Sequence, residues 1–302
     1  MSLSDSAPPH PVTVSDWIRW GCRALESHLD RPEEESRYLM EAVLGSRTGV
    51  WTQAFSPLEP DKVHLFQNWI ARRIRREPFH LIVGEVDFCG RFLTIQSGVL
   101  VPRPETELVV QCCVQELKRS DRKKNSPLRI LDLGAGSGAI AISILMEIPD
   151  SRGVAVELEP KALSVLQVNR TRYNLENRLA VVRGDWGDML SSGPLFDCVV
   201  SNPPYIPTAV IESLEPEIRC YEPISALDGG VDGLEAYRNI LSFAPGLLRE
   251  EGILVFEIGS DQANAELFRA TTGDNENGLL DPPKILKDVP GQERVILWKK
   301  RV

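Results

Sequence analysis

Histidine is absent from the sequence beyond residue 80, and this absence is its most informative feature. All four histidines of the 302 residues precede residue 81, at His10, His28, His64 and His80. A reaction carried out by the rest of the chain therefore has no imidazole of its own as a general base. This absence excludes Ser-His-Asp hydrolases and most zinc sites from the larger part of the protein.

Paired cysteines and long apolar runs are also missing. The six cysteines include no C-x-x-C pair, so the sequence indicates neither a zinc knuckle nor a thioredoxin-type motif. We expect buried thiols in a reducing compartment, the cytoplasm, and no metal site. The chain has no stretch of about 18 apolar residues, so no membrane span and no membrane partner are predicted.

Positive charge is in deficit. The formal net charge is −9, and because residues 1–83 are nearly balanced, most of the acidic excess belongs to the remainder. Broad binding to nucleic-acid phosphates needs a positive surface, so no direct nucleic-acid partner is expected. The 42% of hydrophobic and 25% of charged residues are typical of a folded soluble protein, and the length allows two domains.

Residues 1–80 are predicted to form a small helical N-terminal domain. Thr13 and Asp16 have the spacing of a capping box, and Pro32 suits the first turn of a second helix. A third helix over 60–76 ends in a cluster of four arginines: Arg72, Arg73, Arg75 and Arg76. The cluster is either a solvated face that complements the helix dipole or a contact surface for an acidic partner.

Residues 81–100 are predicted to form a β-hairpin connector, with its turn at Cys89-Gly90-Arg91. From 101 to 302 short apolar strands alternate with helical stretches, which indicates βαβ units, a mostly parallel sheet and an α/β fold class. A closing pair of strands follows at the end. The expected strands are 129–133, 153–158, 180–183, 196–201, 252–258, 284–288 and 294–299.

A glycine-rich turn follows the first of these strands, in ILDLGAGSGAIAISIL. The glycines permit tight turns and close approach of a ligand, and the helix that begins near Ala139 directs free N–H groups toward it. Glu157 ends the next strand, 23 positions after Gly134, where a carboxylate can accept both hydroxyls of a ribose. These features predict a nucleoside-containing cofactor.

The glycine turn fits two cofactor fingerprints. Gly134-x-Gly136-x-x-Ala139 matches the dinucleotide-binding pattern. The same segment resembles the D-x-G-x-G-x-G loop of S-adenosylmethionine-dependent methyltransferases, with Asp132 as the leading acid. A nicotinamide dehydrogenase would need a hydride-handling acid such as histidine, and a purely structural glycine turn would leave Glu157 without a role.

The segment Asn202-Pro203-Pro204-Tyr205 favours the methyltransferase. It follows the strand 196–201 at the carboxyl edge of the sheet, where ligands of α/β proteins bind. The prolines remove N–H donors and fix φ, so the Pro203 carbonyl is expected to point outward beside the Asn202 side-chain carbonyl. Two acceptors suit the two hydrogens of a planar –NH2 group, and the Tyr205 ring can stack on its plane. A proline-rich loop without a ligand is the alternative.

Such a clamp explains how a weak nucleophile reacts. The lone pair of an amide or aryl amine nitrogen is delocalised, and proximity and alignment toward a sulfonium methyl can be worth roughly 7–11 kcal/mol. The nitrogen becomes acidic only once methylation begins, so no strong base is needed, in agreement with the missing histidines. Asn202, Pro203 and Tyr205 are therefore the predicted catalytic residues.

Enzymes that methylate adenine, guanine or glutamine share Asn-Pro-Pro-Tyr, and other segments separate them. RREPFHLIVGEVDFCGRFLTIQSGVLVPRPETE, YEPISALDGGVDGLEAYRNI and GDW resemble the HemK/PrmC family, the peptide chain release factor N5-glutamine methyltransferases. The resemblance covers essentially the whole chain. It implies a Rossmann-like S-adenosylmethionine-dependent methyltransferase fold with a seven-stranded sheet, and S-adenosyl-L-methionine as the methyl donor.

The resemblance also implies which residues bind the donor. Glu157 matches the ribose-binding acid, although the family usually has Asp there, and Asp185 and Trp186 match the residues that border the adenine. Asn202 is assigned to both the donor and the acceptor. Five further positions match the loop that cradles the methionine part: Gly134, Ala135, Gly136, Ser137 and Gly138.

The implied acceptor is the glutamine of the Gly-Gly-Gln motif in class I release factors. The residues that match the clamp on this glutamine are Asn202, Pro203, Pro204 and Tyr205. Arg103 and Thr106 resemble lining of the shared pocket, with an N-cap and a surface ion pair as the structural alternative. No site is assigned to the polar stretch Thr271–Pro283, which is longer than in the family.

The release factor is also the implied protein partner. The resemblance assigns its docking to the helical domain 1–80, with the arginines at 72–76 as a candidate contact, and we expect a monomer. An amino-methyltransferase acting on adenine or guanine of a nucleic acid remains an alternative, but it would need a basic face. A catalytically inactive scaffold is the third possibility, which the intact Asn202 disfavours.

Overall fold

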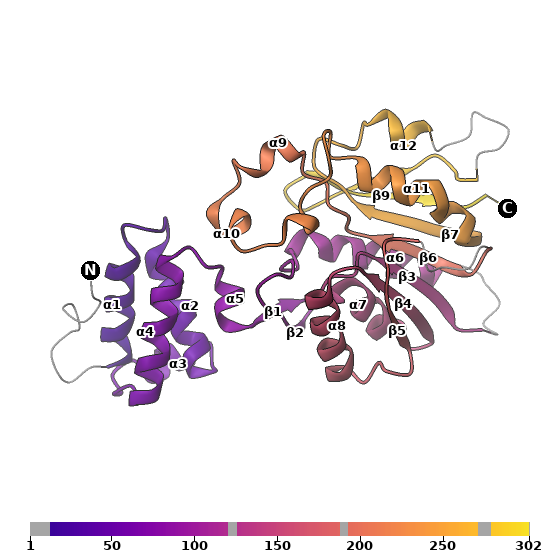
Figure 1. The fold of residues 1–302 in the computed structure, drawn as a ribbon. Coiled ribbons are helices and arrows are strands. Elements are labelled where there is room, and N and C mark those ends of the chain that lie inside the picture. The colour runs from indigo at the N-terminus through magenta and orange to yellow at the C-terminus, as the bar shows by residue number, and fades with distance from the viewer. Residues whose placement is uncertain (1–12, 120–125, 188–192, 271–278, 302) are drawn as a thin grey trace. The chain divides into compact units, whose positions relative to one another are not determined.

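The chain folds into two compact units (Figure 1). The computed structural model describes residues 13–119, 126–187, 193–270 and 279–301. One unit is Met1–Gly84 with Glu215–Tyr221, and the other is Glu85–Leu214 with Glu222–Val302. The short segment Glu215–Tyr221 therefore belongs to the helical unit, although it lies far along the sequence. None of the described helices combines the length and apolar character needed to cross a bilayer.

The first unit is helical, as the sequence predicts. Thr13 and Asp16 form the expected capping box, in which Asp16 Oδ2 accepts from the Thr13 backbone N–H at 2.9 Å. The helix after Pro32 ends at Gly45 in a left-handed conformation. Trp20 and Phe66 lie in the buried core. The helices are α1 (Val14–Leu25), α2 (Pro32–Leu44), α3 (Gly49–Thr52), α4 (Pro60–Ile74), α5 (Phe79–Val83) and α10 (Pro216–Arg219).

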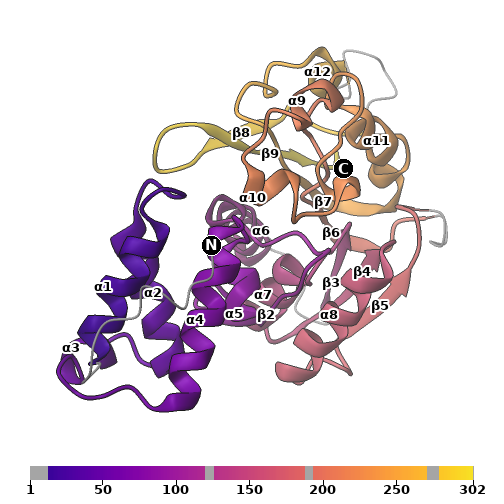
Figure 2. The same cartoon turned by 60° about the vertical axis from the view of Figure 1, so that its left-hand side comes forward.

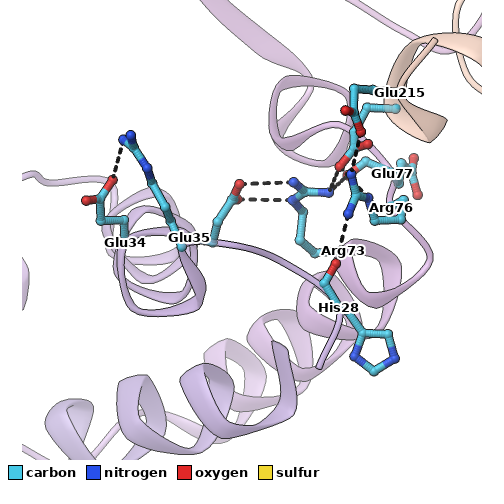
Figure 3. Close-up of polar contacts among 9 residues, drawn as sticks. His28, Glu34, Glu35, Arg73, Arg76, Glu77 and Glu215 are labelled. Carbon is cyan, nitrogen blue, oxygen red and sulfur yellow. Dashed lines mark hydrogen bonds and ion pairs between the residues drawn. The ribbon is translucent and has the colours of Figure 1, made fainter. Parts of the chain in front are cut away.

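Arg73 joins three helices of this unit (Figure 3). It is only 6% exposed, and its Nε and Nη2 donate to the two carboxylate oxygens of Glu35 in α2 at 3.1 and 3.0 Å. Its Nη1 donates to Glu217 Oε1 in α10 at 3.0 Å. Arg76 also pairs with Glu217 in α10 and, at 3.1 Å, with Glu215, which directly precedes that helix. These ion pairs attach Glu215–Tyr221 to the helical unit.

The arginine cluster is therefore not a uniformly solvated face. Arg72 forms two hydrogen bonds to the Glu77 carboxylate, at 2.6 and 2.8 Å. Arg73 and Arg76 are also paired with carboxylates, and Arg75 is the exposed member of the cluster. The Arg75 carbonyl in turn accepts from the Tyr221 hydroxyl at 2.6 Å. Three of the four charges thus hold the unit together instead of completing only the dipole of α4.

The second unit opens with the predicted hairpin. Strands β1 (Glu85–Phe88) and β2 (Arg91–Thr94) pair antiparallel, with Phe88 opposite Arg91. Cys89 and Gly90 have φ angles of 51° and 70°, so the loop has two residues, both in the left-handed region, as two-residue hairpins prefer. Arg91 begins the second strand instead of closing the turn.

A seven-stranded sheet forms the centre of this unit, in the order β5-β4-β3-β6-β7-β9-β8. The first five strands along that order are mutually parallel, and β9 is antiparallel to both of its neighbours. Figure 2 shows β8 and β9 in yellow at the edge of the sheet. The strands are β3 (Leu128–Leu133), β4 (Ser151–Glu157), β5 (Leu179–Arg183), β6 (Phe196–Ser201), β7 (Leu248–Glu257), β8 (Lys284–Lys287) and β9 (Glu293–Lys299).

Every predicted strand is present, with boundaries within two residues of those expected except at the start of β7. β7 starts at Leu248 and not at residue 252, because its pairing with β6 contains an irregularity between Phe196 and Cys198. The polar residues Arg249–Glu251 occupy this irregular part, so the sequence carries no apolar alternation there. The stretch Thr271–Pro283 lies partly outside the described residues, which exclude 271–278.

Helices cover both faces of the sheet. Leu131 and Leu133 of β3 pack in one core with Tyr237 and Ile240 of α11, whereas Asp132, which alternates with them, bonds to α7. The glycine turn follows β3 directly and leads into α7. The remaining elements are η2 (Pro104–Thr106), α6 (Glu107–Arg119), α7 (Ala139–Glu147), α8 (Pro160–Arg172), α9 (Thr208–Ile211), η3 (Ile224–Ala226), α11 (Glu235–Leu247) and α12 (Glu266–Ala270).

Candidate active site

A cavity of about 600 Å³ lies in the second unit at the carboxyl ends of the parallel strands. Seven of the residues that the sequence assigns to the site line it: Gly134, Gly136, Glu157, Asp185, Trp186, Asn202 and Pro204. Ala135, Ser137 and Gly138 complete the glycine turn behind them. Arg103 and Thr106 are not among the described residues that line this cavity.

The glycine turn is held by Glu157. The Gly136 N–H donates to Glu157 Oε2 at 2.7 Å, and the N–H groups of Leu158 and Glu159 both donate to Oε1 at 2.8 Å. Gly136 has a φ of 56°, and a Cβ there would meet nothing within 4 Å, so its backbone conformation and not lack of space favours glycine. The carboxylate thus connects the loop after β3 to the end of β4.

Asp132, the leading acid of the loop, supports the adjacent helix. Its Oδ2 accepts from the Ala141 N–H at 3.0 Å in the first turn of α7. Burial raises the pKa of Asp132 to about 7. The hydrogen bond from Ala141 lowers this pKa, and the charge of Glu157 raises it further. Asp132 therefore caps α7 beneath the cavity and does not line it.

Trp186 has an unusual backbone conformation. Its φ of 45° is rare for a bulky residue, and its indole lies over Gly134, where a Cβ would come 3.4 Å from the ring. Trp186 and Asp185 line the same cavity as Glu157. Strain of this kind persists where surrounding structure holds the residue in place, and it gathers at ligand sites.

The Asn-Pro-Pro-Tyr segment begins at Asn202, directly after the last residue of β6. Asn202 Nδ2 donates to Thr106 Oγ1 at 3.2 Å, and the Thr106 hydroxyl donates to Glu257 Oε2 at 2.6 Å. Among the residues that the structure describes, no donor reaches the carbonyl of buried Pro203. Thr106 is therefore buried and contacts Asn202 without lining the cavity itself. Glu257 also belongs to this group, and no sequence pattern indicates it.

Tyr205 is packed against the segment that contains Gly229 and Gly233. A Cβ at Gly229 would lie 2.8 Å from Tyr205 Cα, and one at Gly233 would lie 2.4 Å from the Tyr205 carbonyl oxygen. Gln262 Nε2 donates to the carbonyls of both Tyr205 and Gly233, at 3.0 and 3.1 Å. The glycines thus permit a close backbone approach, and Gln262, which no sequence pattern marked, fixes it. Burial raises the pKa of Tyr205 to about 12.

Arg103 forms an ion pair instead of lining the cavity. Its Nη2 donates to both carboxylate oxygens of Glu222, at 2.7 and 2.8 Å, and the Glu222 side chain is 1% exposed. Burial raises the pKa of Glu222, against the charge of Arg103. This pair anchors the residues that follow Glu222, of which Pro223 and Ser225 line the cavity.

The cavity suits a nucleoside-bearing donor. It has room above Gly136, a carboxylate at the end of β4 and an indole beside the loop. Among the described residues, no group of three or more His, Cys, Asp or Glu is arranged to hold a metal ion.

Comparisons with known proteins agree with this geometry. The family model described as PrmC N-terminal domain matches residues 16–84, and the methyltransferase small domain matches 110–213. The chain is 37% identical over 290 residues to the release factor glutamine methyltransferase of Caulobacter vibrioides, covering 95% of this chain and 96% of that protein. It is 35% identical over 282 residues to the human MTRF1L release factor glutamine methyltransferase, covering 89% and 81%.

The crystal structure of the hMettl16 catalytic domain with an RNA hairpin superposes with a TM-score of 0.52, at 13% identity over 80% of this chain and 82% of that one, a likeness of fold. The sheet, the glycine turn and Asn202–Tyr205 define a Rossmann-like S-adenosylmethionine-dependent methyltransferase. Within that class, the chain belongs to the release factor glutamine methyltransferase family.

Proposed function

We propose that this protein transfers a methyl group from S-adenosyl-L-methionine to the N5 side-chain amide of the glutamine in the Gly-Gly-Gln motif of class I peptide chain release factors. The relatives named for this activity align over most of the chain. The modification supports translation termination. The protein acts in the cytoplasm, where release factors act, and works as a monomer without direct contact to nucleic acid.

The orientation of Asn202 is the observation that carries this proposal. Its Nδ2 is engaged by Thr106, so its Oδ1 is left to accept a hydrogen bond from a ligand. The carbonyl of Pro203 is a second acceptor on the same segment. A primary amide offers two N–H donors in one plane, and the two acceptors hold both, with Tyr205 as the aromatic neighbour.

Alignment is the main contribution of these residues. When bound, S-adenosylmethionine supplies an electrophilic methyl group on a sulfonium. The N–C bond forms as the S–CH3 bond breaks, and the amide proton leaves to solvent. Asn202 and Pro203 orient the nitrogen and stabilise the N–H groups as they become acidic, which can account for roughly 7–11 kcal/mol of the barrier.

We assign the donor to the residues of the cavity. The turn Gly134–Gly138 holds the methionine part, Glu157 the ribose hydroxyls, and Asp185 with Trp186 the adenine. A carboxylate has about four acceptor positions, and the three N–H groups on Glu157 leave one of them, on Oε2, for the ribose. Arg103 and Thr106 contribute to acceptor binding indirectly, through Glu222 and Asn202.

We also assign roles to the parts of the chain. Residues 1–80 form the substrate-docking domain, 81–100 a hairpin connector and 101–302 the catalytic domain. Within the docking domain, Arg75 is the exposed member of the arginine cluster and the best candidate for contact with the release factor.

The decisive experiment is incubation of the protein with labelled S-adenosylmethionine and a purified class I release factor, followed by mass mapping of the modified residue. We expect a single methyl group on the glutamine of Gly-Gly-Gln, and none when that glutamine is replaced by asparagine. Labelling of adenine or guanine in added RNA or DNA, with no label on glutamine, would overturn the assignment.

A further inference from the structure

Glu257 is a buried carboxyl group behind the Asn-Pro-Pro-Tyr segment, and the clamp itself does not use it. It is the last residue of β7 and is 2% exposed. Thr106, 3% exposed at the end of η2, lies between it and Asn202. The three side chains form one hydrogen-bonded group, with 3.2 Å from Asn202 Nδ2 to Thr106 Oγ1 and 2.6 Å from Thr106 Oγ1 to Glu257 Oε2. The Asn202 amide also forms a hydrogen bond to the Glu257 carboxyl group itself, and an ionised carboxylate can accept only from its Nδ2 end.

The direction of these hydrogen bonds follows from chemistry. An ionised carboxylate only accepts, so the single hydroxyl hydrogen of Thr106 is donated to Glu257. Thr106 Oγ1 is then left only its lone pairs for Asn202, and it can pair with the Nδ2 end of the amide but not with the Oδ1 end. The ionised carboxylate therefore determines which end of Asn202 remains for the acceptor.

We propose that Glu257 and Thr106 are positioning residues, which fix the Asn202 amide with its carbonyl oxygen toward the acceptor and so select a substrate nitrogen that carries hydrogens to donate. The proposal rests on the proposed function, since it gives Asn202 the role of acceptor-binding oxygen. Neither Glu257 nor Thr106 touches the reacting atoms.

Protonation of Glu257 reverses this direction. A neutral carboxyl group can donate to Thr106 Oγ1, whose hydroxyl is then free to donate to Asn202 Oδ1, and the amide turns its NH2 group toward the acceptor. Burial raises the pKa of Glu257 to about 7, and the nearby Glu105 charge adds to this, while Arg294 and the Thr106 and Asn202 hydrogen bonds oppose it. The two tyrosines whose own pKa values the Glu257 charge raises, Tyr205 and Tyr237, are neutral in this range.

The test uses the full chain and compares Thr106→Val with Thr106→Ser. Valine has the shape of threonine but no hydroxyl, so we expect kcat on a Gly-Gly-Gln release factor to fall by about 10²-fold, as small misplacements of a positioning group do. Binding of S-adenosylhomocysteine should stay the same within about a factor of two, because the cavity lining is untouched. Serine should restore most of the activity that valine loses.

A second variant, Glu257→Gln, examines the direction itself. Wild-type kcat should fall as the pH is lowered through about 7, and this acid limb should be absent in Glu257→Gln, because the glutamine side chain does not titrate. Equal kcat in the valine and serine variants, or an unchanged acid limb in Glu257→Gln, would overturn the proposal. If the wild-type protein does not methylate glutamine, the proposed function itself is wrong. If it does, and Thr106→Val has the same kcat as wild type, only the positioning role is wrong.

Discussion

Arg73 and Glu217 form an ion pair across 144 positions of the sequence, with 3.0 Å from Nη1 to Oε1. Glu35 holds the other side of the same guanidinium. The pair holds the segment Glu215–Tyr221 in the helical unit. In the sequence, this segment lies between the Asn-Pro-Pro-Tyr segment and Glu222. The unit that the N-terminal sequence begins is therefore completed by residues that follow the Asn-Pro-Pro-Tyr segment.

Loss of this arginine should destabilise the protein. Arg73→Met keeps most of the side-chain volume but leaves Glu35 and Glu217 without their shared partner, so we expect the free energy of unfolding to fall by about 3 kcal/mol. Urea denaturation followed by circular dichroism measures this change. The matched control is Arg75→Met, whose side chain is exposed and which should change stability by less than about 0.5 kcal/mol. Similar losses in both variants would contradict the role of Arg73.

Arg75 provides the test of docking. Arg75→Glu should lower kcat/KM for intact release factor severalfold and leave methylation of a short Gly-Gly-Gln peptide unchanged, because a peptide lacks the surface that the helical unit would bind. Arg47→Glu, an exposed position of the same unit, carries the same charge change and serves as the control. An equal loss on protein and peptide would rule out a docking role for Arg75.

The clamp predicts a separation between catalysis and donor binding. Asn202→Ala removes the acceptor oxygen, and we expect kcat to fall by about 10³-fold, the upper range for loss of one hydrogen-bonding group that acts in the transition state. Calorimetric titration with S-adenosylhomocysteine should give a dissociation constant close to that of wild type. Near-normal turnover of this variant would be incompatible with the clamp.

Glu157 is expected to control donor affinity. In Glu157→Gln one amide group replaces an oxygen that accepts N–H donors from Gly136 or from Leu158 and Glu159. Hydrogen bonds to charged groups contribute about 1.5–3 kcal/mol, so donor affinity should weaken by about 10- to 100-fold. Glu157→Asp, which keeps the charge on a shorter side chain, should weaken it less. Calorimetry on both variants decides between a charge effect and a length effect.

Local patterns made much of the fold predictable from the sequence. The apolar strands, the glycine turn and the Thr13 capping box depend on neighbouring residues, and they appear where they were expected. The sequence does not predict the start of β7, because its first residues are mostly polar and irregularly paired. Glu257 and Gln262 could not be found in this way, since each acts through contacts with residues more than 50 positions away.

The Arg73–Glu217 pair cannot form until Glu217 has been synthesised. Glu217 is synthesised 144 residues after Arg73, and at about 5–20 residues per second this delay is roughly 7–30 s. During that interval the nascent helical unit contains an arginine with Glu35 as its carboxylate partner, while strands β3 to β6 are being made. A chain released before residue 215 would carry an unfinished helical unit, and we expect such truncated products to be the most susceptible to proteolysis.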